Sequence, residues 1–101
     1  MHRTRVVNLH HVSDIEQWKR RPDTVYVGRR HPWFGAGSKF ANPYKLFDCK
    51  SRDECLELYA NYLNSSNLIN EIHELRGFEL GCWCDPLLCH THIILKLLGE
   101  A

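Results

Sequence analysis

Three cysteines and two histidines lie within eleven positions near the C-terminal end of the sequence, between Cys82 and His92. They follow residues 78–82, whose alternating apolar side chains predict a short strand. Asp85 suits the N-cap of a following helix, and Pro86 suits its first position because no backbone N–H is needed there. Parallel α/β proteins place their chemistry where a strand ends and a helix begins. This strand-to-helix corner is therefore the first candidate for a functional site.

Zinc binding is one interpretation of the corner. Zinc takes four nitrogen or sulfur ligands in a tetrahedron, and the candidate set is Cys82, Cys84, Cys89 and His90, with His92 as the alternative histidine. The first two cysteines are two positions apart and point to the same side of an extended strand. The third cysteine and the adjacent histidine project about 100° apart on a helix, which makes joint ligation harder. A domain stabilised in this way would be an interaction or nucleic-acid-binding module without catalytic activity.

A second interpretation is a pocket for a small molecule or a nucleotide. The partial positive charge at a helix N-terminus favours thiolates at Cys84 and Cys89. Cys89 and His90 would then be a nucleophile and its base, although sequence neighbours rarely face each other on a helix. A third interpretation is structural: Cys82 is a core residue, since free cysteine is among the most buried residue types, and His90 bonds the turn.

The remaining sequence predicts the elements that must position this corner. Helix starts are indicated by the capping box of Ser51 and Glu54 and by Ser66, and Gly77 and Gly99 suit the helix ends. The predicted segments are, in chain order, strands at 5–9 and 24–28, helices starting at 51 and 66, a strand at 78–82 and a helix at 86–98. A short helical turn is also expected within 14–21, after the first strand.

The order β-β-α-α-β-α predicts an α/β fold. We expect one domain over residues 1–101, Rossmann-like with two or three layers and a short, mostly parallel sheet. The apolar strand at 78–82 is expected to be central and parallel to 24–28. Both strands would then end on the same side, which brings Arg29, Arg30 and the loop 31–48 near the cysteine corner.

The stretch from Arg29 to Lys50 has no helical or strand period and is unusually long for a loop in a compact domain. Its five large aromatic residues make it too aromatic for a disordered segment, so we expect it to pack near the strand ends. The segment 35–39, Gly-Ala-Gly-Ser-Lys, resembles a phosphate cradle only loosely, and glycines required for turns are the favoured interpretation. Asn42 precedes a proline in a turn and could bond its own backbone or a ligand.

Charge is distributed unevenly along the chain. Residues 1–50 carry ten Lys or Arg against four Asp or Glu, whereas residues 51–101 carry three against eight, and the net charge is +1. A basic half attracts phosphate or nucleic acid, although the two halves could equally attract each other. Duplex binding is disfavoured because duplex-binding domains carry a larger basic excess.

The five cysteines and the N-terminus suggest a compartment. Residues 1–7 are basic with only a short apolar step, which is not the pattern of a signal peptide, and no segment approaches the roughly 20 apolar residues of a membrane span. We therefore expect a cytoplasmic protein, in the host cytoplasm if the source is viral, with no membrane partner. Its cysteines are expected to be reduced thiols or metal ligands, not disulfides, with Cys55 in the core.

Several segments together resemble a small domain family of unknown function that occurs in phages, large DNA viruses, bacteria and some eukaryotes. The similarity extends over nearly the whole chain. The segments that carry it are Val25-Tyr26-Val27-Gly28-Arg29, Ser38-Lys39-Phe40-Ala41-Asn42-Pro43-Tyr44, Leu75-Arg76-Gly77, Leu80-Gly81-Cys82-Trp83-Cys84-Asp85-Pro86 and Cys89-His90.

The resemblance implies one pocket shared by both halves of the chain. Its expected members are Arg29, Lys39, Asn42 and Tyr44 from the first half and Cys84, Cys89 and His90 from the second. The expected ligand carries a phosphate and is a nucleotide or nucleic acid, which the domain would bind and could process. The two cations would hold phosphate, Tyr44 or Trp33 would stack on a base, and Cys89 with His90 would line the reacting end.

Overall fold

The structure, a computed structural model, describes residues 3–83 and 90–100. Its sheet has three parallel strands in the order β1-β3-β2, and these are β1 (Arg5–Asn8), β2 (Thr24–Tyr26) and β3 (Glu79–Cys82). β3 lies between the other two, with its Leu80 beside Val6 on one side and Val25 on the other. The prediction that the last strand is central and parallel to the second is confirmed.

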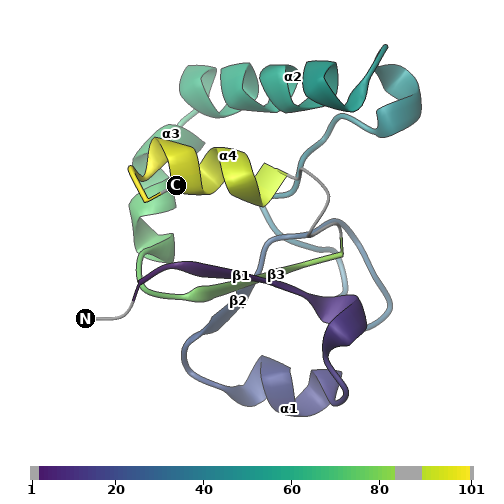
Figure 1. Cartoon of the computed structure of the whole chain (residues 1–101), viewed down its shortest axis with the longest axis vertical. Coiled ribbons are helices and arrows are strands. Elements are labelled where there is room, and N and C mark those ends of the chain that lie inside the picture. Colours follow the sequence, from purple (N-terminus) through teal and green to yellow (C-terminus); the bar gives the residue numbers. More distant parts are fainter. Residues whose placement is uncertain (1–2, 84–89, 101) are drawn as a thin grey trace.

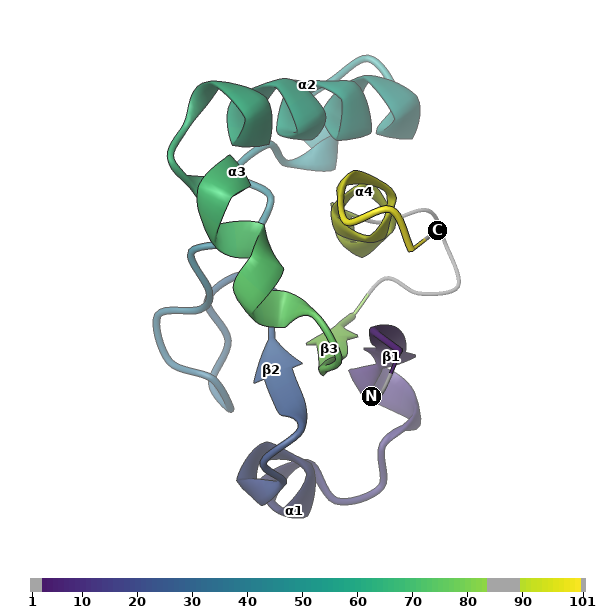
Figure 2. The same cartoon turned by 90° about the vertical axis from the view of Figure 1, so that its left-hand side faces the viewer.

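Helices flank this sheet on both sides. The α-helices are α1 (Ile15–Arg20), α2 (Arg52–Ser65), α3 (Leu68–Glu71) and α4 (His90–Leu97), and the 3₁₀ helices are η1 (Leu9–His11), η2 (Leu46–Asp48) and η3 (Ile72–Leu75). Figures 1 and 2 show α4 between α2 and the sheet, with α1 at the opposite side of the sheet. The fold is therefore mixed α/β with a short parallel sheet, as the element order predicts.

The predicted cap at Ser51 is present, whereas Ser66 does not cap α3, whose N-cap is Asn67 without a side-chain hydrogen bond. The cap expected at Asp85 lies outside the described residues. The Ser51 hydroxyl accepts a hydrogen bond from the backbone N–H of Glu54 at 3.1 Å and starts α2. Gly77 and Gly99 have φ angles of 82° and 77°, in the left-handed region that glycine adopts without steric cost. Residues 66–76, however, are not one regular helix, because α3 ends at Glu71 and η3 follows it. The tighter 3₁₀ turn brings residues three apart onto one face, so that Ile72 and Leu75 are both buried.

The first strand is one residue shorter than predicted. The Asn8 side chain accepts a hydrogen bond from the N–H of His10 at 2.9 Å, which turns the chain into η1. Leu9 enters the core from this turn and is 1% exposed. The hydrogen bond of the Asn8 side chain to the nearby backbone therefore ends the strand one residue early.

The amino ends of the strands carry a network of ion pairs. Arg5 lies 3.4 Å from both Asp23 and Glu79, and Arg21 lies 2.8 Å from Asp23 and 3.6 Å from Glu79. The indole N–H of Trp18 donates to Glu79 at 2.8 Å. The hydrogen bond from Arg21 holds the pKa of Asp23 below its usual range. Arg5 and Arg21 therefore each have carboxylate partners at this end of the sheet.

Trp18 also requires a glycine in the central strand. A Cβ atom on Gly81 would lie 2.4 Å from the Trp18 ring, closer than non-bonded atoms can approach. Trp18 is buried and covers the face of the sheet that α1 occupies. The opposite face packs against the main core, to which Leu80, Ile94, Tyr59 and Leu63 contribute.

Candidate functional site

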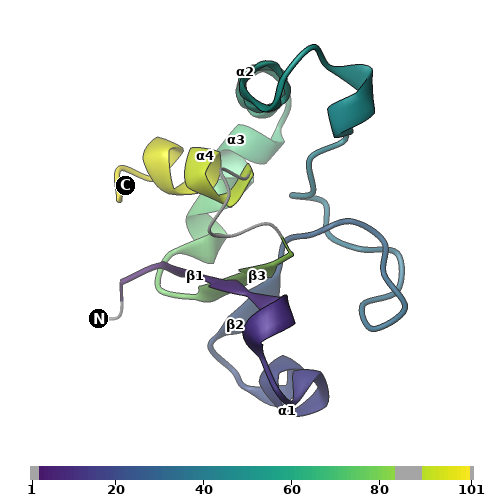
Figure 3. The ribbon, with the colours of Figure 1, turned by 45° about the vertical axis from the view of Figure 1, so that its right-hand side comes forward.

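A cavity of about 250 Å³ opens at the carboxyl ends of the strands. Figure 3 shows the chain from residue 29 onward looping out on this side of the molecule, toward which the strands run. The described lining of the cavity combines arginines, histidines and aromatic rings with a few apolar side chains: Tyr26, Gly28, Arg29, Arg30, His31, Asn42, Tyr44, Arg52, Cys55, Leu56, Cys82, Trp83 and His90. The site therefore lies where a parallel α/β sheet places its ligands.

The described lining of this cavity is basic. Arg29, Arg30 and Arg52 contribute three guanidinium groups, and none of the described lining residues is an aspartate or a glutamate. Arginine N–H groups match the oxygen geometry of carboxylates and phosphates. The cavity wall that the structure describes is therefore suited to an anion.

Arg29 fixes the loop that forms one side of the cavity. Its Nε donates to the carbonyl of Asn42 at 2.8 Å, and its Nη2 donates to the carbonyl of Tyr44 at 2.7 Å. These bonds use two of the five N–H donors of a guanidinium. The Asn42 side chain accepts from the N–H of Tyr44 at 2.9 Å, so its carbonyl oxygen bonds the chain's own backbone. Arg29 and Asn42 thus hold the turn that carries Tyr44.

Aromatic rings form a second side of the cavity. The indole N–H of Trp83 donates to the Tyr26 hydroxyl at 3.0 Å, and that hydroxyl donates to the carbonyl of Arg29 at 2.6 Å. The ring of His31 stacks on Trp83 with centroids 4.3 Å apart. A Cβ on Gly28 would lie 2.5 Å from the Tyr26 hydroxyl, so this relay requires a glycine there. The orientation of the Trp83 indole is therefore set by Tyr26 at the end of β2, whose hydroxyl is in turn held by the backbone carbonyl of Arg29.

His90 occupies the buried end of the cavity. Its Nε2 lies 2.6 Å from the carbonyl oxygen of Val27, and Tyr59 meets the ring edge-on at 5.3 Å. A carbonyl oxygen only accepts, so Nε2 carries the proton in this bond. Burial holds the pKa of His90 below its usual range, and the positive charge of Arg29 acts in the same direction. The ring is therefore neutral near pH 7, and Nδ1 is its acceptor nitrogen.

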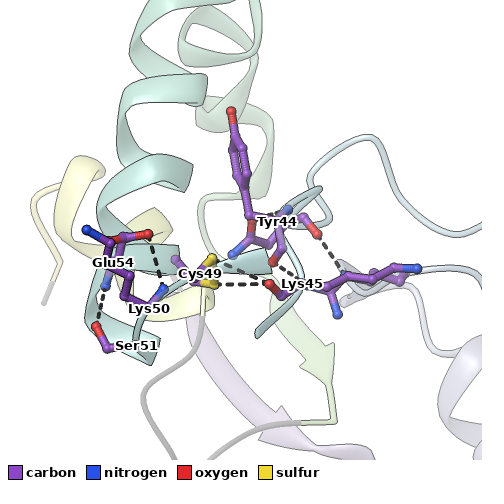
Figure 4. Close-up of a disulfide and its surroundings, with 9 residues drawn as sticks. Tyr44, Lys45, Cys49, Lys50, Ser51 and Glu54 are labelled. Atoms are coloured by element: carbon purple, nitrogen blue, oxygen red, sulfur yellow. Dashed lines mark hydrogen bonds between the residues drawn. A yellow bond between two sulfur atoms is a disulfide. The ribbon is translucent and has the colours of Figure 1, made fainter. Parts of the chain in front are cut away.

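Cys49 and Cys55 form a disulfide beside the cavity, which corrects the expectation of reduced or metal-bound cysteines for this pair. η2 turns the chain back onto the first turn of α2, so the two Cα atoms lie 5.6 Å apart, within the range for a disulfide. Both sulfur atoms lie 3.4 Å from the carbonyl oxygen of Lys45 (Figure 4). Cys55 is buried, as predicted, and it lines the cavity next to Arg52.

The predicted site residues divide into three groups. Arg29, Asn42, Tyr44 and His90 all line the cavity, as does the candidate zinc ligand Cys82. Cys82 is 1% exposed and belongs to the core, with its sulfur 4.0 Å from the Thr91 hydroxyl.

Lys39 is placed elsewhere, and two predicted cysteines are not described. Lys39 pairs with Glu71 at 2.8 Å and Glu74 at 2.9 Å, and it is not among the cavity lining residues. Cys84 and Cys89 lie outside the described residues. Within 3–83 and 90–100, no group of three or more His, Cys, Asp or Glu side chains is arranged to hold a metal ion. The ligand, catalytic and zinc roles of these residues therefore stay predictions.

Sequence reasoning did not single out several polar and aromatic lining residues, among them Arg52, Tyr26 and Trp83. Arg52 follows the Ser51 cap, so its place at the first turn of α2 was predicted, but the packing of that turn over the strand ends was not. Tyr26 was expected only as part of a strand, and His31 only as part of the loop 31–48 that was expected near the corner. The one local signal for Tyr26, His31 and Trp83 was position, because all three follow or end a parallel strand.

The fold and the cavity together define a small α/β domain with an arginine-rich, aromatic-walled cavity at the carboxyl edge of its sheet. The chain belongs to the family described as Domain of unknown function (DUF4326), whose model matches residues 7–100. The resemblance to a family of unknown function is confirmed by this match.

A viral protein is similar to this chain. It is the uncharacterized protein R718 of Acanthamoeba polyphaga mimivirus, 32% identical over 84 residues, which cover 72% of this chain. The match covers 65% of the viral protein, so the chain spans just under two thirds of its length. No solved structure matches the chain significantly. Among the described helices, none has the length and apolar character required to cross a membrane.

Proposed function

We propose that this domain binds a phosphate-bearing ligand of the nucleotide class in the cavity at the carboxyl ends of its strands. The observation that carries the proposal is the placement of Arg29, Arg30 and Arg52 around one cavity whose described lining contains no carboxylate. Arginine–phosphate hydrogen bonds are charge-assisted and therefore stronger than neutral ones. A phosphate at this point would complete an environment that otherwise concentrates positive charge.

Aromatic side chains support a nucleotide over a bare anion. Trp83 is fixed by its bond to Tyr26, and Tyr44 is carried by the turn that Arg29 holds. A base stacks on such rings without requiring a particular sequence. One cavity thus places cations for phosphate beside aromatic rings. Because His31 already stacks on Trp83, Tyr44 is the ring that we propose for the base.

The test is a titration of the oxidised protein with inorganic phosphate, a nucleoside and the matching nucleoside monophosphate. We expect the monophosphate to raise the melting temperature most, because it engages both kinds of group. Arg30→Ala should weaken its binding by roughly tenfold or more, the loss expected for one charge-assisted hydrogen bond. Lys39→Ala is the matched control, because it removes an equal charge that is already paired with Glu71 and Glu74. Absence of binding by all three compounds, or an Arg30→Ala variant that binds like the wild type, would contradict the proposal.

Processing of the ligand is the second part of the proposal, and it rests on His90. The neutral ring donates from Nε2 to Val27, so Nδ1 has the lone pair that a general base requires. His90→Gln keeps an amide N–H for Val27 and removes that lone pair. If the bound nucleotide is converted to a product by the wild type, we expect the Gln variant to bind without conversion. An unchanged rate in that variant would remove His90 from the chemistry.

Zinc binding is a second candidate function, favoured by the same histidine bond. Histidines that ligate zinc through one nitrogen usually donate from the other nitrogen to a carbonyl or carboxylate. His90 donates in this way to Val27, and Cys82 lines the same cavity. The measurement is metal content by elemental analysis, with one zinc per chain and unfolding by a chelator expected for a structural site. Metal-free protein of full stability would exclude this candidate.

A further inference from the structure

A second hollow adjoins the cavity and shares two of its residues. It has a volume of about 650 Å³ and is lined by Arg30, His31, Pro32, Gly35 and Ala36. Arg30 and His31 also line the first cavity, so the two spaces meet at these side chains. The surface therefore extends from the strand ends along the turn 31–36.

The turn that forms this hollow has a fixed backbone. His31 and Gly35 are paired across it, with the N–H of His31 donating to the carbonyl of Gly35 at 3.1 Å. The N–H of Phe34 donates to the carbonyl of His31 at 2.9 Å, and Nδ1 of His31 accepts from the N–H of Trp33. Nothing lies within 4 Å of a Cβ built on Gly35, so the floor of the hollow is open.

The turn 31–36 resembles the cavity in carrying aromatic side chains and nearby cations. Trp33 is 47% exposed, which is unusual for so large an aromatic side chain, and it follows Arg30 by three positions on the turn that carries both. The ammonium group of Lys19 lies 5.3 Å from the centre of the Phe34 ring on the same turn. The lining of the second hollow also has no carboxylate among its described residues. Phe34 itself stacks on Tyr26, so Trp33 is the exposed ring of this turn. An exposed aromatic ring beside cations is a surface that single strands of nucleic acid bind.

The volume of the first cavity limits how much of a ligand it can enclose. The first cavity, at about 250 Å³, is just below the usual range for ligand pockets, so it accommodates no more than about one nucleotide unit. Any further unit must leave past Arg30 and His31 into the second hollow. A duplex is too wide for this path, and a net charge of +1 gives no broad basic face for one.

We infer that the ligand is the end of a single-stranded oligonucleotide, with its terminal unit in the cavity and the next units along residues 30–36, against Trp33. This inference rests on the proposed function, since it assigns the class of ligand to the same cavity. Arg30 would contact the phosphate that joins the two units, because it borders both spaces.

The experiment compares 5′-phosphorylated ligands of one, two and four nucleotides, as DNA and as RNA, by their affinity for the oxidised protein. We expect affinity to rise by about fivefold or more from one to two nucleotides, the lower limit for one stacked base. Ala36→Asp places a negative charge in the second hollow and should remove this gain, while the mononucleotide affinity stays within about twofold. Ala36→Ser is the matched control and should keep the gain. Trp33→Ala should also reduce it.

The outcomes separate the two claims. Mononucleotide binding without any gain with length would overturn the oligonucleotide assignment and leave the proposed function standing. A gain that persists in both Ala36→Asp and Trp33→Ala would overturn the assignment of the second hollow. Absence of binding at every length would overturn both claims. A gain for RNA alone, or for DNA alone, supports the inference and identifies the kind of strand.

Discussion

At the amino ends of the strands, Arg5 and Arg21 lie against the carboxylates of Asp23 and Glu79, whereas at the carboxyl ends Arg30 borders a cavity without a described carboxylate. Both ends belong to the same three strands and both carry guanidinium groups. The two ends differ in the groups that these guanidiniums contact. At one end the partner is supplied by the chain, and the cations hold the sheet together. At the other end Arg29 bonds two backbone carbonyl oxygens, and the described lining contains no carboxylate.

The largest effect on stability is expected from a substitution in the central strand that displaces Trp18. Gly81→Ala would place a methyl group 2.4 Å from the Trp18 ring, whose indole bonds Glu79. Overpacking of this kind costs about 1–3 kcal/mol, and we expect the upper end in a central strand. Urea unfolding measures it. If the clash is the cause, the double variant Gly81→Ala with Trp18→Leu should lose at least about 1 kcal/mol less unfolding free energy than the sum of the two single losses. Additive losses would show that another contact is responsible.

Reduction of the disulfide is expected to act mainly at the carboxyl ends. The bond joins cysteines six positions apart, and closing so small a loop contributes about 2 kcal/mol. Reductant should lower the melting temperature and also weaken nucleotide binding, because Cys55 and Arg52 line the cavity. Cys49→Ser should match the reduced protein and show no further response to reductant. A Cys49→Ser variant that still responds would show that another thiol is involved.

Glu79→Gln isolates charge at the amino ends. The amide retains an oxygen for the Trp18 indole and removes the partner that Arg5 and Arg21 share. Because the Glu79 side chain is only 16% exposed, we expect a loss of about 1–2 kcal/mol in urea unfolding. Glu16→Gln, whose side chain is 50% exposed beside Lys19, is the control and should change stability by less than about 0.5 kcal/mol. Equal effects of the two substitutions would contradict the special role of the amino-end network.

Acidification should distinguish the two ends by pH. Burial lowers the pKa of His90, so the unfolded chain takes up a proton first, near its ordinary value of about 6.5. The contribution of His90 to the free energy of unfolding is therefore fully present above this pH. It is lost as the pH drops toward the pKa of His90 in the folded protein, by at most about 1.4 kcal/mol per pH unit. The amino ends respond later: Arg21 lowers the pKa of Asp23, so its contribution is lost only as the pH falls below about 4.

His90→Gln provides the control for this pH dependence, because the amide does not titrate and can still donate to Val27. Unfolding free energies measured from pH 7 to pH 5 should then lose the slope that His90 produces. A variant that keeps the full slope would show that a different group takes up the proton.

Local signals in the sequence were sufficient for much of the fold. Ser51 and Glu54 started α2, Gly77 and Gly99 ended helical segments, and the apolar strand at Glu79–Cys82 proved central. Each of these depends on residues within a few positions of one another, or on burial that apolar composition predicts. The break of residues 66–76 into α3 and η3 was not predicted, because it follows from burying Ile72 and Leu75 together.

The site was predicted in part, for the same physical reason. Arg29, Asn42 and Tyr44 were placed beside the strand ends by topology alone. Lys39 was assigned to the pocket by the family resemblance, but its ion pairs with Glu71 and Glu74 depend on where α3 and η3 pack. The Cys49–Cys55 bond likewise depends on how η2 turns onto α2. Such contacts are set by tertiary packing, which no local pattern contains.

The most direct test of the contrast between the two ends is amide chemical-shift mapping by NMR with a nucleoside monophosphate. We predict that the perturbed signals cluster at residues 28–31, 42–44 and 82–83 and include the indole N–H of Trp83, while those of Arg5, Asp23 and Glu79 stay unchanged. Perturbations centred on the strand starts, or none at saturating nucleotide, would contradict the assignment of the anion site to the carboxyl edge.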